Sequence, residues 1–158
     1  MGEDRRDRIK LVSNQFGEIE FERDVIITFP EGLLGFEEFK RYVIMDVKEC
    51  EPFQWLLSVE DPELGFPVLR PIFVYPQYEA ELLEEWAEGE PNAQIVYLIV
   101  TLEGDPTRVT ANLKGPIVID ANRRLGRQIV LISRDYPTNH PLIQMSRGAE
   151  GQGSRREG

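Results

Sequence analysis

The chain is dominated by short segments in which hydrophobic and polar residues alternate with a period of two. In Phe16–Phe21 apolar residues alternate with acidic ones, as expected for a strand with one face in water. Other hydrophobic runs are short and end at Gly, Pro or Asp, which is typical of strands joined by turns. Further strands are predicted at Val25–Phe29, Tyr42–Val47, Phe53–Val59, Phe66–Leu69, Ile72–Tyr75, Ile95–Leu102, Arg108–Leu113, Ile117–Asp120 and Gln128–Ile132.

Only two segments have a helical pattern. Ala80–Glu88 places Leu82 and Trp86 on one face and glutamates on the other, while Phe36–Arg41 could form one or two turns. About ten short strands with so little helix predict a mainly β fold. We expect a small antiparallel β-barrel or pseudo-barrel with one or two short helices.

The 158 residues suffice for one domain with a hydrophobic core. Residues 1–8 alternate charges without an apolar period, and residues 144–158 are rich in glycine and poor in apolar side chains. Such segments cannot bury enough apolar surface to offset the entropy of ordering. We therefore predict a disordered N-terminal arm at 1–8, a single β-barrel-like domain at 9–143 and a disordered C-terminal tail at 144–158.

The sequence favours a cytoplasmic location. Its longest apolar run, Ile95–Val100, is far shorter than the roughly 20 residues that cross a bilayer, and residues 1–8 have no apolar core of a secretory signal. Cys50 is the only cysteine, which fits a reducing compartment. We expect no membrane association.

Charge is distributed unevenly along the chain, whose formal net charge is −10. Residues 9–105 hold 6 Lys or Arg and 21 Asp or Glu, whereas residues 106–143 hold 6 and 2. A negative field over most of a domain repels phosphate backbones and attracts basic surfaces. The pattern indicates a protein that binds other proteins.

Residues for catalysis or metal binding are scarce. The chain has one histidine, His140, and one cysteine, so a zinc site with these ligands is not expected. Neither the Gly-x-Ser-x-Gly motif of serine hydrolases nor the glycine-rich motifs that bind phosphates occur. We expect no enzyme activity, no metal and no cofactor.

One basic segment leaves an alternative function open. Arg123, Arg124 and Arg127 flank a predicted turn at Leu125–Gly126, and small barrels often bind oligonucleotides. The surrounding negative charge opposes the approach of a nucleic acid. The alternative is therefore a small-barrel nucleic-acid-binding module that uses this turn, and the favoured reading is no direct nucleic-acid binding.

Six segments of the chain form a pattern when they are taken in sequence order. They are Gln15–Ile19, Ile27–Glu37, Trp55–Pro62, Thr110–Ile119, Gly126–Leu131 and Tyr136–Leu142. A single segment is a weak signal, but the set resembles the flagellar assembly factor (FliW) family. The resemblance extends over about Ile9–Leu142, nearly the whole predicted domain.

The resemblance implies a β-barrel-like fold and two protein partners. One is flagellin, held in the cytoplasm before export, and the other is the translational repressor CsrA. In that family the assembly factor blocks the repressor's hold on the flagellin message, and accumulating flagellin sequesters the assembly factor. The resemblance thus implies a regulatory role without catalysis, and nothing in the sequence requires more than a monomer.

Candidate partner contacts are exposed acids near turns and on the predicted helix. Glu85 and Glu88 would lie at the negative end of the helix dipole, where a partner's cation could compensate. The resemblance adds Phe36 and Asn112, for which core packing and a turn or ladder hydrogen bond are the respective alternatives. The acidic candidates are Glu60, Asp61, Glu63, Glu84, Glu85 and Glu88.

Overall fold

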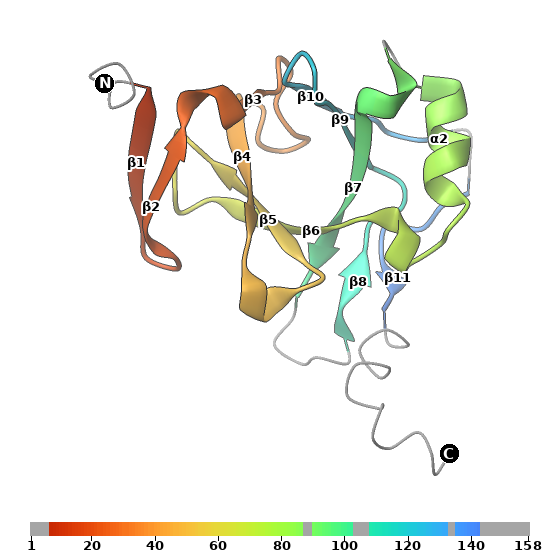
Figure 1. Ribbon diagram of the computed structural model, residues 1–158. Helices are drawn as coiled ribbons and strands as arrows, with labels where there is room; N and C mark the ends of the chain where they lie inside the picture. Colours follow the sequence, from red (N-terminus) through yellow and green to blue (C-terminus); the bar gives the residue numbers. More distant parts are fainter. Residues whose placement is uncertain (1–6, 87–89, 103–107, 133–134, 143–158) are drawn as a thin grey trace.

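The computed structural model describes residues 7–86, 90–102, 108–132 and 135–142 (Figure 1). Its strands are β1 (Arg8–Ser13), β2 (Gly17–Glu22), β3 (Ile27–Thr28), β4 (Arg41–Asp46), β5 (Gln54–Ser58), β6 (Gly65–Leu69), β7 (Gln94–Thr101), β8 (Thr110–Ala111), β9 (Ile117–Asp120), β10 (Leu125–Gln128) and β11 (His140–Pro141). The α-helix is α2 (Tyr78–Trp86), and 3-10 turns occupy Arg23–Val25, Lys48–Cys50, Pro71–Phe73 and Pro91–Ala93.

Seven strands close into a barrel. Their order is β7–β6–β5–β4–β3–β10–β9, and β9 pairs back onto β7. All of these pairings are antiparallel except that of β3 with β10, which is parallel. Strands β8 and β11 extend the sheet from the end of β7. The prediction of a mainly β fold built on a small barrel is confirmed.

Strand β7 separates two hydrophobic cores. Its alternate residues point to opposite faces, so Tyr97 faces the barrel interior while Val96 and Leu98 face outward. The outer face is covered by α2, whose Tyr78 and Leu82 are buried against it. Both faces of β7 are therefore buried, which explains its continuous apolar run. The barrel core comprises Ile27, Phe29, Leu33, Tyr42, Leu56, Val68, Tyr97, Ile117 and Ile119.

Strands β1 and β2 form a separate two-stranded hairpin on the side of the barrel away from α2 (Figure 1). Its outer face is charged, with an ion pair between Lys10 and Glu18 at 3.3 Å. At the hairpin tip, the Phe16 ring meets the edge of Trp55 on β5 with 5.4 Å between centroids. The hairpin is thus held to the barrel through its turn.

Several predicted elements are wrong. Ile72–Tyr75 contains no strand, since Pro71 begins a 3-10 turn, and Phe36–Arg41 contains no helix. The last predicted strand, Gln128–Ile132, starts three residues too late and ends four residues too late, because β10 occupies Leu125–Gln128. Strands β1 and β11 were not predicted, whereas the predicted helix at Ala80–Glu88 corresponds to α2.

The predicted disordered ends lie almost wholly outside the described residues. Strand β1 begins at Arg8, one residue before the predicted start of the domain. Residues 1–6 and the tail at 144–158 are not described, so the two disordered segments stay predictions. In the described part of the chain, no helix has the length and apolar character needed to cross a membrane.

Candidate functional site

Three of the predicted acidic contacts, Glu60, Asp61 and Glu63, lie together after β5, and each accepts a hydrogen bond from within the chain. Glu60 accepts a hydrogen bond from the main-chain N–H of Lys40 at 2.7 Å, and its carboxylate lies 3.5 Å from the Nε of Arg41. This carboxylate fixes the loop that leads into β4. Asp61 accepts the main-chain N–H of Glu63 at 3.1 Å within its own turn.

Glu63 joins this turn to the N-terminal hairpin. Its two carboxylate oxygens accept the main-chain N–H of Asn14 at 3.0 and 3.3 Å. The same hairpin turn is closed by Ser13, whose hydroxyl accepts the N–H groups of Gln15 and Phe16. The structure therefore gives Glu63 a structural role, and a role in partner binding stays a proposal.

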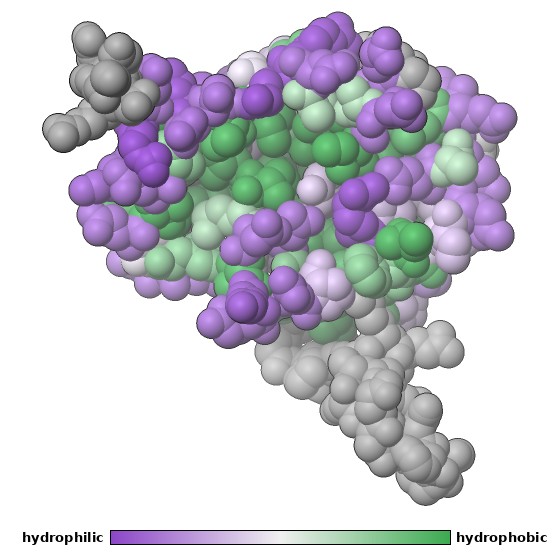
Figure 2. Space-filling view, in the orientation of Figure 1, coloured by the Kyte–Doolittle hydropathy of each residue, from purple (hydrophilic) through white to green (hydrophobic). Residues whose placement is uncertain are grey.

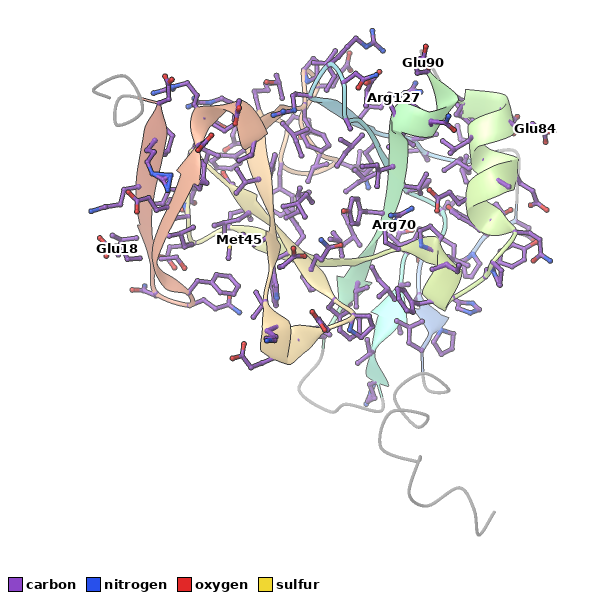
Figure 3. The ribbon with its side chains drawn as sticks, in the orientation of Figure 1. Glu18, Met45, Arg70, Glu84, Glu90 and Arg127 are labelled. Atoms are coloured by element: carbon purple, nitrogen blue, oxygen red, sulfur yellow. The ribbon has the colours of Figure 1, made fainter. Side chains whose placement is uncertain are left out.

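Helix α2 presents the other acidic candidates. Glu84 and Glu85 are exposed, and Glu84 lies on the side opposite buried Leu82 and points away from the barrel in Figure 3, whereas Glu85 lies beside Leu82 at the edge of the buried face. Glu88 lies outside the described residues. Two neighbouring exposed carboxylates on one helix form a surface that a basic partner could contact.

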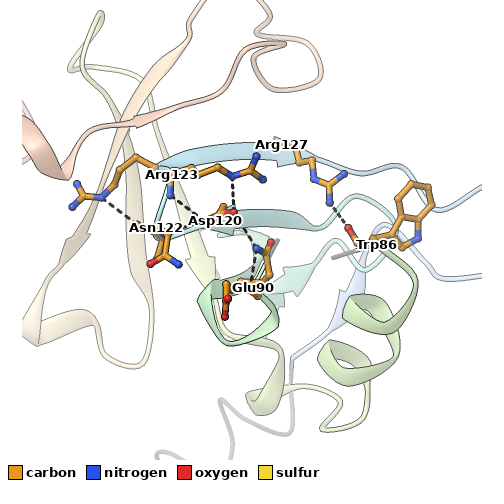
Figure 4. Close-up of polar contacts among 9 residues, drawn as sticks. Trp86, Glu90, Asp120, Asn122, Arg123 and Arg127 are labelled. Atoms are coloured by element: carbon orange, nitrogen blue, oxygen red, sulfur yellow. Dashed lines mark hydrogen bonds and ion pairs between the residues drawn. The ribbon is translucent and has the colours of Figure 1, made fainter. Parts of the chain in front are cut away.

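The C-terminal end of α2 has a cation from within the chain. The guanidinium of Arg127 on β10 donates a hydrogen bond to the main-chain carbonyl of Trp86, the last residue of the helix (Figure 4). A cation at this end offsets the negative pole of the helix dipole and satisfies a carbonyl that has no helical partner. A partner's cation, considered for this position from the sequence alone, is therefore not needed to compensate the helix end.

Phe36 and Asn112 make the structural contacts that were given as alternatives to partner binding, namely packing for Phe36 and turn hydrogen bonds for Asn112. Phe36 is half-buried and meets the ring of Phe66 edge-to-face at 5.2 Å between centroids. Asn112 uses its side-chain oxygen to accept the N–H groups of Lys114 and Gly115 at 2.9 and 3.0 Å. Both side chains shape loops next to the barrel, and neither contact tests a role in binding.

The three arginines of the alternative function do not act as one basic patch. The turn lies at residues 121–124, four residues that precede β10, and not at Leu125–Gly126. Arg123 donates from Nε to the carboxylate of Asp120 at 2.9 Å (Figure 4). Arg127 is engaged with α2, as described above. Arg124 has a positive φ of 55°, and its Nε donates to the carbonyl of Ala121 at 3.3 Å.

Asp120 organises this turn. Its carboxylate accepts the main-chain N–H groups of Asn122 and Arg123, both at 3.0 Å, and the amide of Gln94 at 3.2 Å. The N–H and guanidinium of Arg123 hold the pKa of this buried carboxyl below its usual value of 3.8. The arrangement is a capped turn between β9 and β10.

Comparison with known proteins identifies the family. The sequence model of the FliW protein matches residues 10–142. The chain belongs to the FliW family.

Relatives and a solved structure agree with this FliW assignment. The flagellar assembly factor FliW of Clostridium botulinum is 43% identical over 85% of this chain and 98% of its own length. That of Natranaerobius thermophilus is 40% identical over 92% and 99%. A crystal structure of the flagellar assembly factor FliW has a TM-score of 0.75 at 34% identity, covering 85% of this chain and 96% of the other.

The described part of this FliW chain has few side chains suited to catalysis or metal binding. No group of three or more His, Cys, Asp or Glu side chains within it is placed to hold a metal ion. His140 pairs with Ala111 through β11, and Cys50 is half-buried in a 3-10 turn. The relatives are named as assembly factors, which is a non-catalytic role.

Proposed function

We propose that this FliW protein is a non-enzymatic cytoplasmic assembly factor that binds flagellin and antagonises a CsrA-type translational repressor. By holding the repressor away from the flagellin message it would permit flagellin synthesis, and accumulating flagellin would sequester the assembly factor and so free the repressor. The protein acts as a monomer in this proposal and contacts no nucleic acid directly.

The observation that carries the proposal is the excess of acidic side chains at the surface. Glutamates 84 and 85 of α2 are exposed, and so are glutamates 18, 20 and 22 of the hairpin, which pair with Lys10 and Arg8. Other basic side chains also have acidic partners within the chain: Arg123 pairs with Asp120, and Arg70 binds Glu79 through two contacts of 2.9 and 3.0 Å. Because 28 acidic residues stand against 18 basic ones, this pairing leaves an excess of negative charge that faces solvent.

This charge suits a protein that opposes an RNA-binding partner. A negative field accelerates encounter with a basic surface, and close charge pairs add specificity. Once the complex forms, the same field repels the phosphates of incoming RNA. Binding of RNA by the assembly factor itself would defeat this role.

A binding titration tests both partners. Purified protein should form a saturable complex with purified flagellin and with the purified repressor, measured by biolayer interferometry. In a gel-shift assay it should release the repressor from a flagellin leader RNA, and it should not shift that RNA alone. Failure to bind either protein would overturn the proposal, and a direct RNA shift lost on Arg123→Glu would favour the nucleic-acid alternative.

The exposed acids of α2 are the first contacts to test. Glu84→Lys should slow association with the basic repressor by about threefold at low salt, and the effect should decrease as salt rises. Glu49→Lys, at an exposed position in the turn Lys48–Cys50, makes the same charge change elsewhere and serves as the control. Equal on-rates for the two variants would remove α2 from the contact surface.

The acidic residues after β5 need a different kind of substitution to test a role in binding. Because Glu60 and Glu63 hold loops in place, Glu60→Lys or Glu63→Lys would disturb the fold as well as the charge. Asp61→Asn keeps the hydrogen bond to the N–H of Glu63 and removes only the charge. A reduced on-rate for this variant would place the turn in the interface, and an unchanged rate would exclude Asp61.

A further inference from the structure

One mouth of the barrel is an open apolar hollow of about 270 Å³. It lies between β4 and β7, and Figure 2 shows hydrophobic surface in this area with hydrophilic side chains around it. Its apolar lining consists of Val25, Ile27, Ile44, Ile95, Tyr97, Ile119 and Ala121. Mouths of β-barrels are common sites for small ligands, although ligand pockets more often start at about 300 Å³.

A single charged residue, Arg124, completes the wall of the hollow. It sits in the turn between β9 and β10, where Asp120 fixes the neighbouring residues. Its Nε is bonded to the carbonyl of Ala121, but its Nη1 is out of contact with solvent and has no acceptor among the described residues. A buried donor without an acceptor is unfavourable, because it has lost water and gained nothing in exchange.

The two neighbouring arginines differ from Arg124 because neither has a buried side-chain nitrogen without an acceptor. Arg123 is paired with a carboxylate, and Arg127 donates to the end of α2. Arg124 thus combines a permanent positive charge, an unused donor and an apolar surface beside it. A ligand that fits must carry an anionic acceptor next to a short apolar group.

We propose that this hollow binds a small aliphatic carboxylate, with the chain against the apolar mouth of the barrel and the carboxylate hydrogen-bonded to the guanidinium of Arg124. A carboxylate offers two oxygens to the planar guanidinium, which is the pairing that arginine makes best.

Octanoate is a suitable probe, and NMR of the ¹⁵N-labelled full-length protein is a suitable readout. Octanoate should shift the amide signals of Ala121, Arg124 and Ile95 in a saturable way. Octan-1-ol has the same chain without the charge and should bind about tenfold or more weakly, because a charge-assisted hydrogen bond is lost. Equal binding of the two compounds, or no saturable shift with octanoate, would overturn the proposal.

Substitutions at the hollow test whether the carboxylate of octanoate binds at Arg124. Arg124→Gln should weaken octanoate binding by about tenfold, whereas Arg23→Gln, which makes the same charge change outside the hollow, should not. Val25→Glu places a carboxylate at a rim position that is 44% exposed, so the protein should fold normally and lose octanoate binding. If Arg124→Gln does not fold, Val25→Glu still decides the question: unchanged affinity would contradict the assignment.

A further binding experiment with a short peptide distinguishes a free carboxylic acid from the C-terminal carboxylate of another protein. A short peptide that ends in leucine carries the same chemistry and should bind more weakly than octanoate. Binding of the peptide without binding of octanoate would overturn the proposal in favour of a protein docking site.

Discussion

Gly126 on β10 lies directly against the ring of Phe29, which is fully buried in the barrel. A Cβ atom at position 126 would stand less than 3 Å from three carbons of that ring. Phe29 in turn packs edge-to-face on Tyr42 with 5.3 Å between centroids. The strand that closes the barrel can therefore pass here only because residue 126 has no side chain.

Gly126→Ala should destabilise the protein by about 1–3 kcal/mol, because the added methyl group overpacks the core. Urea unfolding followed by tryptophan fluorescence measures the change. Phe29→Leu creates room at the same place, so the alanine substitution should cost much less in that background. An equal cost in both backgrounds would show that the ring of Phe29 is not the obstacle.

Glu63→Ala should loosen the N-terminal hairpin, because it removes the carboxylate that accepts the N–H of Asn14. We expect a loss of about 1 kcal/mol in the free energy of unfolding, with faster hydrogen exchange at β1 and β2 than at β4 and β5. Glu49→Ala is the control at an exposed position. Uniform exchange changes across the barrel would argue against a local tether.

Arg127→Gln should weaken the C-terminal end of α2, because the carbonyl of Trp86 loses a charged donor. The expected loss is about 0.5–1 kcal/mol, and circular dichroism with hydrogen exchange would detect it at the helix. Arg23→Gln makes the same charge change in a 3-10 turn. Equal helix protection in the two variants would contradict the capping role.

Asp120→Asn should change how stability depends on pH. The pKa of Asp120 in the folded protein is below its ordinary value of 3.8, chiefly through the N–H and guanidinium of Arg123. The carboxylate therefore stabilises the fold fully above that ordinary value, and this contribution is lost as pH falls through the lowered pKa. Melting temperatures of wild type and variant should differ most near neutral pH and converge in acid. A constant difference would exclude the carboxylate as the source.

The sequence pattern predicted the barrel because its strands are buried on at least one face and carry a clear period or apolar run. It failed where short runs are ambiguous. Ile72–Tyr75 has the composition of a strand, yet Pro71 fixes a backbone angle that begins a 3-10 turn. In contrast, Arg8–Leu11 alternates charged and apolar residues, which is a signal for the first part of β1.

The roles of the acidic candidates could not be predicted from local sequence. Glu60 and Glu63 accept main-chain N–H groups that are 20 and 49 residues away along the chain. Nothing near either glutamate indicates these partners, since the loops meet only after the barrel and the hairpin have formed. Glu84 was easier, because helical spacing alone places it opposite buried Leu82. Glu85 is exposed but lies on the side of Tyr78 and Leu82, which the spacing of the sequence pattern did not predict.

The parallel pairing of β3 with β10 has a consequence for synthesis on the ribosome. Thr28 donates its N–H to the carbonyl of Arg124 at 3.0 Å, so the seam joins parts of the chain made early and late. Strands β4 to β7 can pair as they emerge, but the nascent sheet keeps open edges until β9 and β10 leave the exit tunnel. Because open edges invite pairing with other chains, a polypeptide truncated before β9 would aggregate where the full-length chain folds.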